Sequence, residues 1–124
     1  MNQAIKELWV EQLPNYKRGR FVMRSSNDEF CPLGVLCNLH KYRAFPLISG
    51  DDWHSVVKGG GSGYTYLGQQ TILPLEVVRW AELEDNAVLS NSGCYVSLGG
   101  YYLTQLNDLG VSIPEIAALI TKYL

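Results

Sequence analysis

The sequence predicts a single α+β domain spanning residues 1–124, in which about five helices pack on a small, mostly antiparallel sheet. A chain of 124 residues fits one domain. Its 47% hydrophobic and 18% charged content is that of a globular protein rather than a disordered one. Segments with a helical period alternate with short strand-like segments that end at turn residues, which is the pattern of an α+β fold.

The N-terminal segment predicts a helix followed by a strand. The helix lies between Asn2, which can cap it, and Pro14, which ends it. The next segment, 15–24, begins as a turn and continues as a strand. Strand alternation would give this segment two faces, with Phe21 and Met23 on one and Arg20, Val22 and Arg24 on the other.

A buried helix is predicted over 30–40, with Pro32 in its first turn. Gly34 lies inside this helix, where glycine costs about 1 kcal/mol relative to alanine. We therefore expect another backbone segment to approach the helix closely at Gly34.

The second half of the chain consists of short elements and glycine-rich turns. Residues 44–63 are the least regular, and the glycine run at 58–63 is predicted as a loop that leads into a strand at 64–67. The other predicted elements are a helix over 73–83, a hairpin of strands 86–89 and 94–96, a helix over 98–109 that ends at Gly110, and a last helix with a capping box from Ser112 to Glu115.

The net charge and the cysteine content argue against several classes of function for this protein. The net charge of −2 gives no general attraction for nucleic acid, and no recognition helix follows the helix-turn-helix-like run at 109–117, so DNA binding is not expected. The chain shows no signal peptide and no apolar run long enough for a membrane span. Three cysteines, an odd number, do not suit a disulfide framework. We expect a cytoplasmic protein with free thiols and no cofactor.

Four basic residues lie close together in this acidic chain: Lys17, Arg18, Arg20 and Arg24. An arginine guanidinium can hold a phosphate or a carboxylate through two parallel hydrogen bonds. The segment is therefore a candidate anion site. The alternative interpretation is an edge strand whose charges protect it from aggregation.

Two further features would complete such a site. The glycine run can present backbone N–H groups to a phosphate, with Lys58 as the counter-charge, although it is not a P-loop. Tyr64 and Tyr66 share one face of the following strand and could stack on a nucleobase. A plain surface loop and core packing are the alternative interpretations.

Cysteine chemistry is a separate candidate. Cys31 is predicted at a helix N-terminus, where the helix dipole favours a thiolate nucleophile, and His40 or His54 could act as its base. The alternative is that Cys31 and Cys37 are small core residues, as free cysteines often are. The spacing of Cys31, Cys37 and His40 matches no usual zinc motif, so no metal site is expected.

Four runs occur in the order of a known family: Arg18-Gly19-Arg20; Phe30-Cys31 with Leu33-Gly34-Val35-Leu36-Cys37; Leu73-Pro74 with Val77 and Trp80; and Leu106-Asn107-Asp108 with Gly110, Ser112 and Glu115-Ile116-Ala117. With them the chain resembles, over most of its length, a family of small hypothetical proteins common in phages, prophages and bacteria. Members often have Cys-Cys at the place of Cys31-Pro32 and Asp at that of Asn38, and these differences speak against a paired-thiol or catalytic function. The resemblance implies no established activity. It does imply a phage setting, in which small proteins often block host defences.

The leading hypothesis is a non-catalytic, phage-related binding protein that sequesters a phosphorylated small molecule such as an immune-signalling nucleotide. Its predicted ligand-binding residues are Arg18, Arg20, Arg24 and Lys58 for the phosphate, and Tyr64 and Tyr66 for the base. Two alternatives stay open: a protein–protein interaction module that inhibits a host defence protein, and a cysteine-dependent enzyme centred on Cys31. The sequence also leaves a homo-oligomer open.

Overall fold

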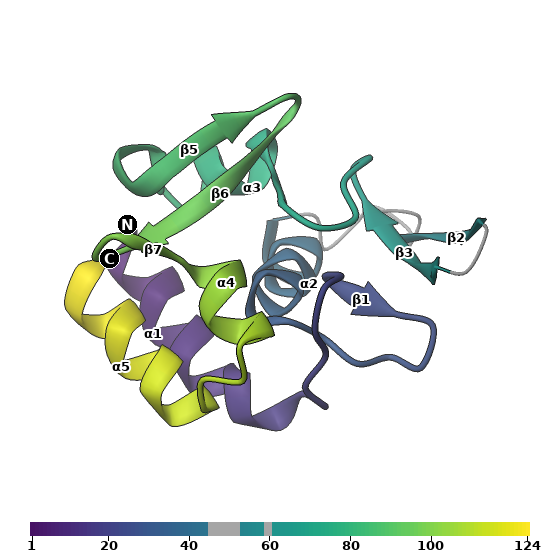
Figure 1. The fold of residues 1–124 in the computed structure, drawn as a ribbon. Helices are drawn as coiled ribbons and strands as arrows, with labels where there is room; N and C mark the ends of the chain where they lie inside the picture. Colours follow the sequence, from purple (N-terminus) through teal and green to yellow (C-terminus); the bar gives the residue numbers. More distant parts are fainter. Residues whose placement is uncertain (45–52, 59–60) are drawn as a thin grey trace.

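A computed structural model describes residues 1–44, 53–58 and 61–124, and confirms the α+β class. Within these residues the helix α2 (Pro32–Ala44) lies at the centre of the molecule, as Figure 1 shows. The other helices are α1 (Gln3–Gln12), α3 (Leu75–Trp80), α4 (Leu103–Asp108) and α5 (Ile113–Tyr123). Helix α2 packs against α1, α3 and α4, so it holds the different parts of the fold together.

The strands are antiparallel, as predicted, and they are divided between two sheets. In the three-stranded sheet the order is β1 (Arg24–Ser25), β3 (Gly61–Tyr66) and β2 (Trp53–Lys58). In the four-stranded sheet β6 (Gly93–Leu98) lies between β4 (Leu73–Pro74) and β5 (Ala87–Ser90), and β7 (Tyr101–Tyr102) pairs with its end. The two sheets stand on different sides of α2 (Figure 1) because each hairpin pairs with a different neighbouring segment.

The two terminal helices follow their local sequence signals. Asn2 caps α1, because its side-chain oxygen accepts the N–H of Ile5 at 3.0 Å. Ser112 caps α5 in the same way by accepting the N–H of Glu115 at 3.3 Å. Helix α5 turns its apolar stripe inward, with Ile116 at the centre of the buried face.

The prediction for Gly34 is confirmed. A Cβ atom at this position would lie 1.9 Å from the carbonyl oxygen of Met23. No side chain fits in that space, so glycine lets the backbone before β1 lie directly on α2. This contact brings the segment that contains Arg18, Arg20 and Phe21 against the first turn of α2.

The predicted strand over 20–24 is wrong for most of its length. Only Arg24 and Ser25 form a strand, and Phe21 has a φ of 71°, which interrupts the alternation. Phe21 and Met23 therefore do not share an environment, since Met23 is fully buried and Phe21 is 71% exposed. Arg20 and Arg24 do not project from a common strand face either.

Other boundaries also differ from the predictions. The helix predicted from Leu98 begins at Leu103, because β6 continues to Leu98 and Gly99 and Gly100 form a turn with φ values of 60° and 97°. The helix predicted from Leu73 begins at Leu75, after the short strand β4. The predicted glycine loop is partly strand, since β3 already begins at Gly61; residues 59–60 lie outside the described part. Among the described helices none is long and apolar enough to cross a bilayer.

Candidate functional site

The predicted site residue Arg18 is bound within the protein. Its Nε donates a hydrogen bond to the side-chain oxygen of Asn107 at 3.0 Å, and a terminal nitrogen donates to the carbonyl oxygens of Asn107 and Val111. Burial lowers the pKa of Arg18, and the positive charge of Arg20 lowers it further. The Arg18 side chain therefore caps the C-terminal end of α4, where carbonyl oxygens attract a cation.

Arg20 lies at the same end of α4 but is exposed. One of its guanidinium nitrogens is 3.2 Å from the place that a Cβ of Gly110 would occupy. No described carboxylate forms an ion pair with Arg20. Its guanidinium is thus accessible to an anion from solution.

Arg24 and the two tyrosines belong to a different part of the molecule. The Arg24 guanidinium pairs with Asp28 at 2.7 Å and lies over the ring of Tyr64, 4.0 Å from its centroid. Tyr66 is fully buried, and its hydroxyl is 2.7 Å from the Nδ1 of His40. Lys58 ends β2, and its side chain lies outside the described part of the chain.

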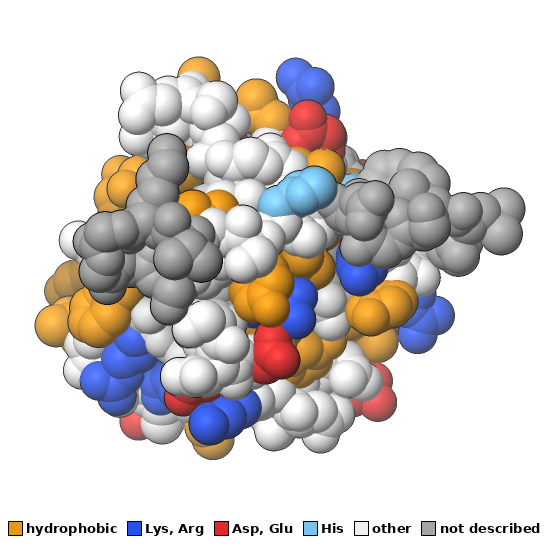
Figure 2. Space-filling view, turned by 90° about the vertical axis from the view of Figure 1, so that its right-hand side faces the viewer, with side chains coloured by type: hydrophobic (Ala, Val, Ile, Leu, Met, Phe, Trp, Pro, Cys, Tyr) orange, Lys and Arg blue, Asp and Glu red, His pale blue; other side chains and the backbone are white. Residues whose placement is uncertain are grey.

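The six predicted ligand-binding residues therefore do not converge on one place. Arg24, Tyr64 and Tyr66 lie together at the three-stranded sheet, whereas Arg18 and Arg20 lie at the end of α4. Figure 2 looks onto the side of the molecule that carries the three-stranded sheet. The Lys and Arg side chains on that face stand apart from one another, among acidic, apolar and neutral side chains.

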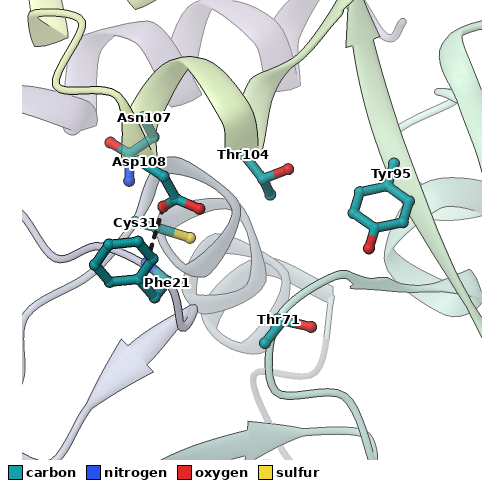
Figure 3. Close-up of a pocket in the computed structure, with 7 residues that line it drawn as sticks. All are labelled: Phe21, Cys31, Thr71, Tyr95, Thr104, Asn107 and Asp108. Carbon is teal, nitrogen blue, oxygen red and sulfur yellow. Dashed lines mark hydrogen bonds between the residues drawn. The ribbon is translucent and has the colours of Figure 1, made fainter.

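A cavity of about 270 Å³ opens between α4, β6 and the starts of α2 and β4 (Figure 3). It is lined by Phe21, Cys31, Thr71, Tyr95, Thr104, Asn107 and Asp108. These side chains come from segments far apart in the sequence, and most of them end in a polar group. The cavity is therefore a candidate site for a small polar ligand.

Asn107 holds one wall of this cavity in place. It has no exposed surface, and its side-chain N–H donates to the carbonyl oxygen of Gly19 at 2.9 Å while its oxygen accepts from Arg18. Next to it, Asp108 accepts the backbone N–H of Phe21 at 2.9 Å. Together these bonds fix residues 18–21 against the end of α4.

Several polar groups on the cavity wall have no hydrogen-bond partner in the part of the chain that the structure describes. The hydroxyls of Thr71, Thr104 and Tyr95 make no hydrogen bond to any residue that the structure describes. The Oδ2 atom of Asp108 has none either, since the bond to Phe21 uses Oδ1. The Tyr95 ring is held by stacking on Tyr102, with centroids 5.0 Å apart. The wall thus offers fixed donors and acceptors to a ligand or to water.

Cys31 also lines this cavity, with only 5% of its surface exposed. Burial raises the pKa of its thiol to about 11, although N–H groups in the first turn of α2 act in the opposite direction. The thiol therefore stays protonated near neutral pH. The interpretation of Cys31 and Cys37 as buried packing residues is confirmed, and all three cysteines are free.

The histidines do not form a catalytic group with Cys31 in this arrangement. No histidine lines the cavity, and His40 is buried beside Tyr66. In the described ranges no three His, Cys, Asp or Glu side chains lie close enough together to hold a metal ion.

The sequence contained a signal for this cavity in its motif runs. Three of the four runs that carry the family resemblance meet at the cavity or directly behind it: 18–20, the run that begins at Phe30-Cys31, and the run with Asn107-Asp108. Residue chemistry alone pointed instead to the arginine and tyrosine segments. The sequence does not show which of these runs lie together in space.

Comparison with known proteins identifies a family but no individual similar protein. Searches of the curated proteins and of the solved structures found no match to this chain. A protein-family comparison matches all of residues 1–124. This agrees with the uncharacterised family that the motif runs predicted. The chain belongs to the family described as Domain of unknown function (DUF8296).

Proposed function

We propose that this chain is a non-catalytic binding protein that sequesters a small nucleotide-type ligand in the cavity between Phe21 and Asp108. The observation that carries the proposal is the set of polar groups on the cavity wall that have no hydrogen-bond partner among the described residues. Polar groups held in place by the scaffold, with no protein partner, are typical of ligand sites.

The size of the cavity supports binding of the base part of such a ligand. Its volume of about 270 Å³ is just below the range of roughly 300–1,000 Å³ that drug-sized ligands occupy. A nucleobase fits inside, and the phosphate would lie outside. Of the predicted cations, Arg20 suits that phosphate, because it is exposed and lies against Gly110, two residues beyond Asp108. Arg18 and Arg24 already bind protein groups.

The state of Cys31 favours binding over cysteine catalysis. A thiol nucleophile has to be deprotonated, and burial raises the pKa of Cys31 to about 11. In the phage setting that the motif runs imply, the ligand would be an immune-signalling nucleotide of a bacterial host, and a stable complex would remove it from signalling.

Isothermal titration calorimetry tests the proposal with a panel of nucleosides, mononucleotides, cyclic nucleotides and ADP-ribose derivatives. We expect one class to bind with micromolar or tighter affinity. The variant Asp108→Asn should weaken binding about tenfold, because it changes a carboxylate acceptor inside the cavity. The matched control Asp28→Asn changes a carboxylate outside the cavity and should bind as the wild type does. Absence of binding across the panel at micromolar concentrations would exclude the proposal.

One observation favours the second candidate function, protein–protein interaction. Leu109 and Phe21 have the largest exposed fractions among the large apolar side chains of the described residues, 80% and 71%. Phe21 lines the cavity, and Leu109 directly follows the cavity residue Asp108 in the sequence. An adaptor or inhibitor would use them as an apolar contact. If this function is correct, a host protein binds the wild type stoichiometrically without nucleotide and fails to bind Leu109→Ser.

A further inference from the structure

Phe21 combines two features that do not favour folding. Its φ of 71° lies in the left-handed region, where the Cβ of a bulky residue is crowded. Its ring is 71% exposed, so it gains little from burial. A strained, exposed aromatic residue at the rim of a cavity points to a functional role.

Neighbouring hydrogen bonds hold Phe21 in this conformation. Its N–H donates to Oδ1 of Asp108, and the carbonyl of Gly19, two residues earlier, accepts from the buried side chain of Asn107. A Cβ at Gly19 would lie 2.8 Å from backbone atoms of Glu29, so the chain is also held from the other side. The backbone position from which the ring projects is thus set before any ligand arrives.

The ring has a counterpart across the cavity. Figure 3 shows Phe21 and Tyr95 on opposite sides, with the carboxyl group of Asp108 and the side chain of Thr104 between them. Tyr95 is supported from behind by Tyr102. A planar ring that enters the cavity can lie against an aromatic face, an interaction that does not depend on the identity of the base.

The polar group beside the ring sets which edge of a ligand fits. A carboxylate accepts hydrogen bonds, and Oδ2 of Asp108 has no partner in the described residues. The matching ligand edge carries N–H donors. Guanine presents two of them side by side, the ring N1–H and the 2-amino group, whereas adenine presents an acceptor at N1.

We propose that Phe21 is a strained aromatic clamp of the cavity and that the ligand is a guanine-type base whose N–H edge binds Asp108. This inference rests on the proposed function and specifies the ligand class and the residue that retains it.

The experiment measures calorimetric affinity for guanosine, inosine and adenosine, and melting temperature, for the wild type and three variants. Phe21→Gly removes both the ring and the strain, while Phe21→Ala removes the ring and keeps the strained Cβ. Leu67→Gly is the matched control, because Leu67 also has a positive φ, 48°, but does not line the cavity.

We expect guanosine to bind the wild type best, inosine to bind more weakly because it lacks the 2-amino group, and adenosine to bind most weakly. Both Phe21 variants should lose about tenfold in guanosine affinity or more, since stacking on one base contributes roughly 1–3 kcal/mol. Phe21→Gly should melt at a higher temperature than Phe21→Ala. Leu67→Gly should change the melting temperature without changing the affinity.

Four results would overturn the inference. Unchanged guanosine affinity in both Phe21 variants would exclude the clamp, although a bound ligand would still support the proposed function. Equal affinity for adenosine and guanosine would exclude the assignment of the base edge. If the wild type binds none of the three nucleosides but binds another member of the larger nucleotide panel, guanine is excluded and the proposed binding function is still supported. If it binds no member of either panel, both this inference and the proposed function are excluded.

Discussion

Two regions of this protein are rich in aromatic and polar side chains, and they differ in what those side chains bind. At the three-stranded sheet, two of the most distinctive polar groups have protein partners: Arg24 binds Asp28, and the hydroxyl of Tyr66 meets His40. In the cavity, the hydroxyls of Thr104 and Tyr95 have no described partner. Residue type is similar in the two regions, so the presence or absence of a described protein partner is what makes the cavity, rather than the sheet, the candidate site.

The largest effect in this comparison is expected behind the cavity, at Asn107. Replacement of Asn107 by Leu leaves the Gly19 carbonyl and the Nε of Arg18 without their side-chain partner, although Arg18 keeps its bonds to the backbone carbonyls of residues 107 and 111. The replacement should lower the free energy of unfolding by about 3 kcal/mol. Urea denaturation measures this loss. Gln105→Leu on the exposed side of the same helix removes one capping bond and should cost about 1 kcal/mol. Equal losses would show that Asn107 does not hold the cavity wall.

The next largest effect is the dependence of the unfolding free energy on pH that is due to Cys31. The folded state binds the thiol proton more tightly than the unfolded state, because burial raises the pKa from 9.0 to about 11. This stabilisation is complete below pH 9 and is lost as the pH rises through 11, which amounts to about 2–3 kcal/mol. The difference in unfolding free energy between the wild type and Cys31→Ser should shrink or reverse over that range. Parallel pH profiles for the two proteins would contradict the prediction.

The smallest effect comes from a matched pair of hydroxyl deletions, one in each region. Tyr66→Phe leaves the buried Nδ1 of His40 without its 2.7 Å partner and should lower the unfolding free energy by about 1–2 kcal/mol. Thr104→Val removes a hydroxyl that has no described partner and should change stability by less than about 0.5 kcal/mol. The comparison between the regions fails if both variants lose the same amount.

Local signals predicted the parts of the fold whose cause is local. The Asn2 and Ser112 caps, the hairpin of β5 and β6, and the close approach at Gly34 are all visible in short stretches of sequence. The conformation of Phe21 was not predictable in this way, because it depends on a hydrogen bond to Asp108, which is 87 residues away. A short-range pattern cannot encode such a bond.

The candidate site was predictable only in part, for the same reason. Arg18 has the chemistry of a phosphate-binding residue, but its partners Asn107 and Val111 lie 89 and 93 residues along the chain. Only the tertiary structure shows that its guanidinium binds α4. The motif runs contain segments that line or support the cavity, but short-range patterns do not show where those segments meet.

The long separation between Gly19 and Asn107 has a consequence for the newly made chain. During synthesis, residues 18–31 leave the ribosome long before the α4 segment exists, so Phe21 and Cys31 have no cavity to line at that stage. The contacts that join residues 18–21 to α4 close a loop of more than 80 residues, and they form only after Asn107 has been made. The proposed ligand binding would therefore report completion of the fold, because nascent chains that end before Asn107 lack the wall that Asn107 and Asp108 provide.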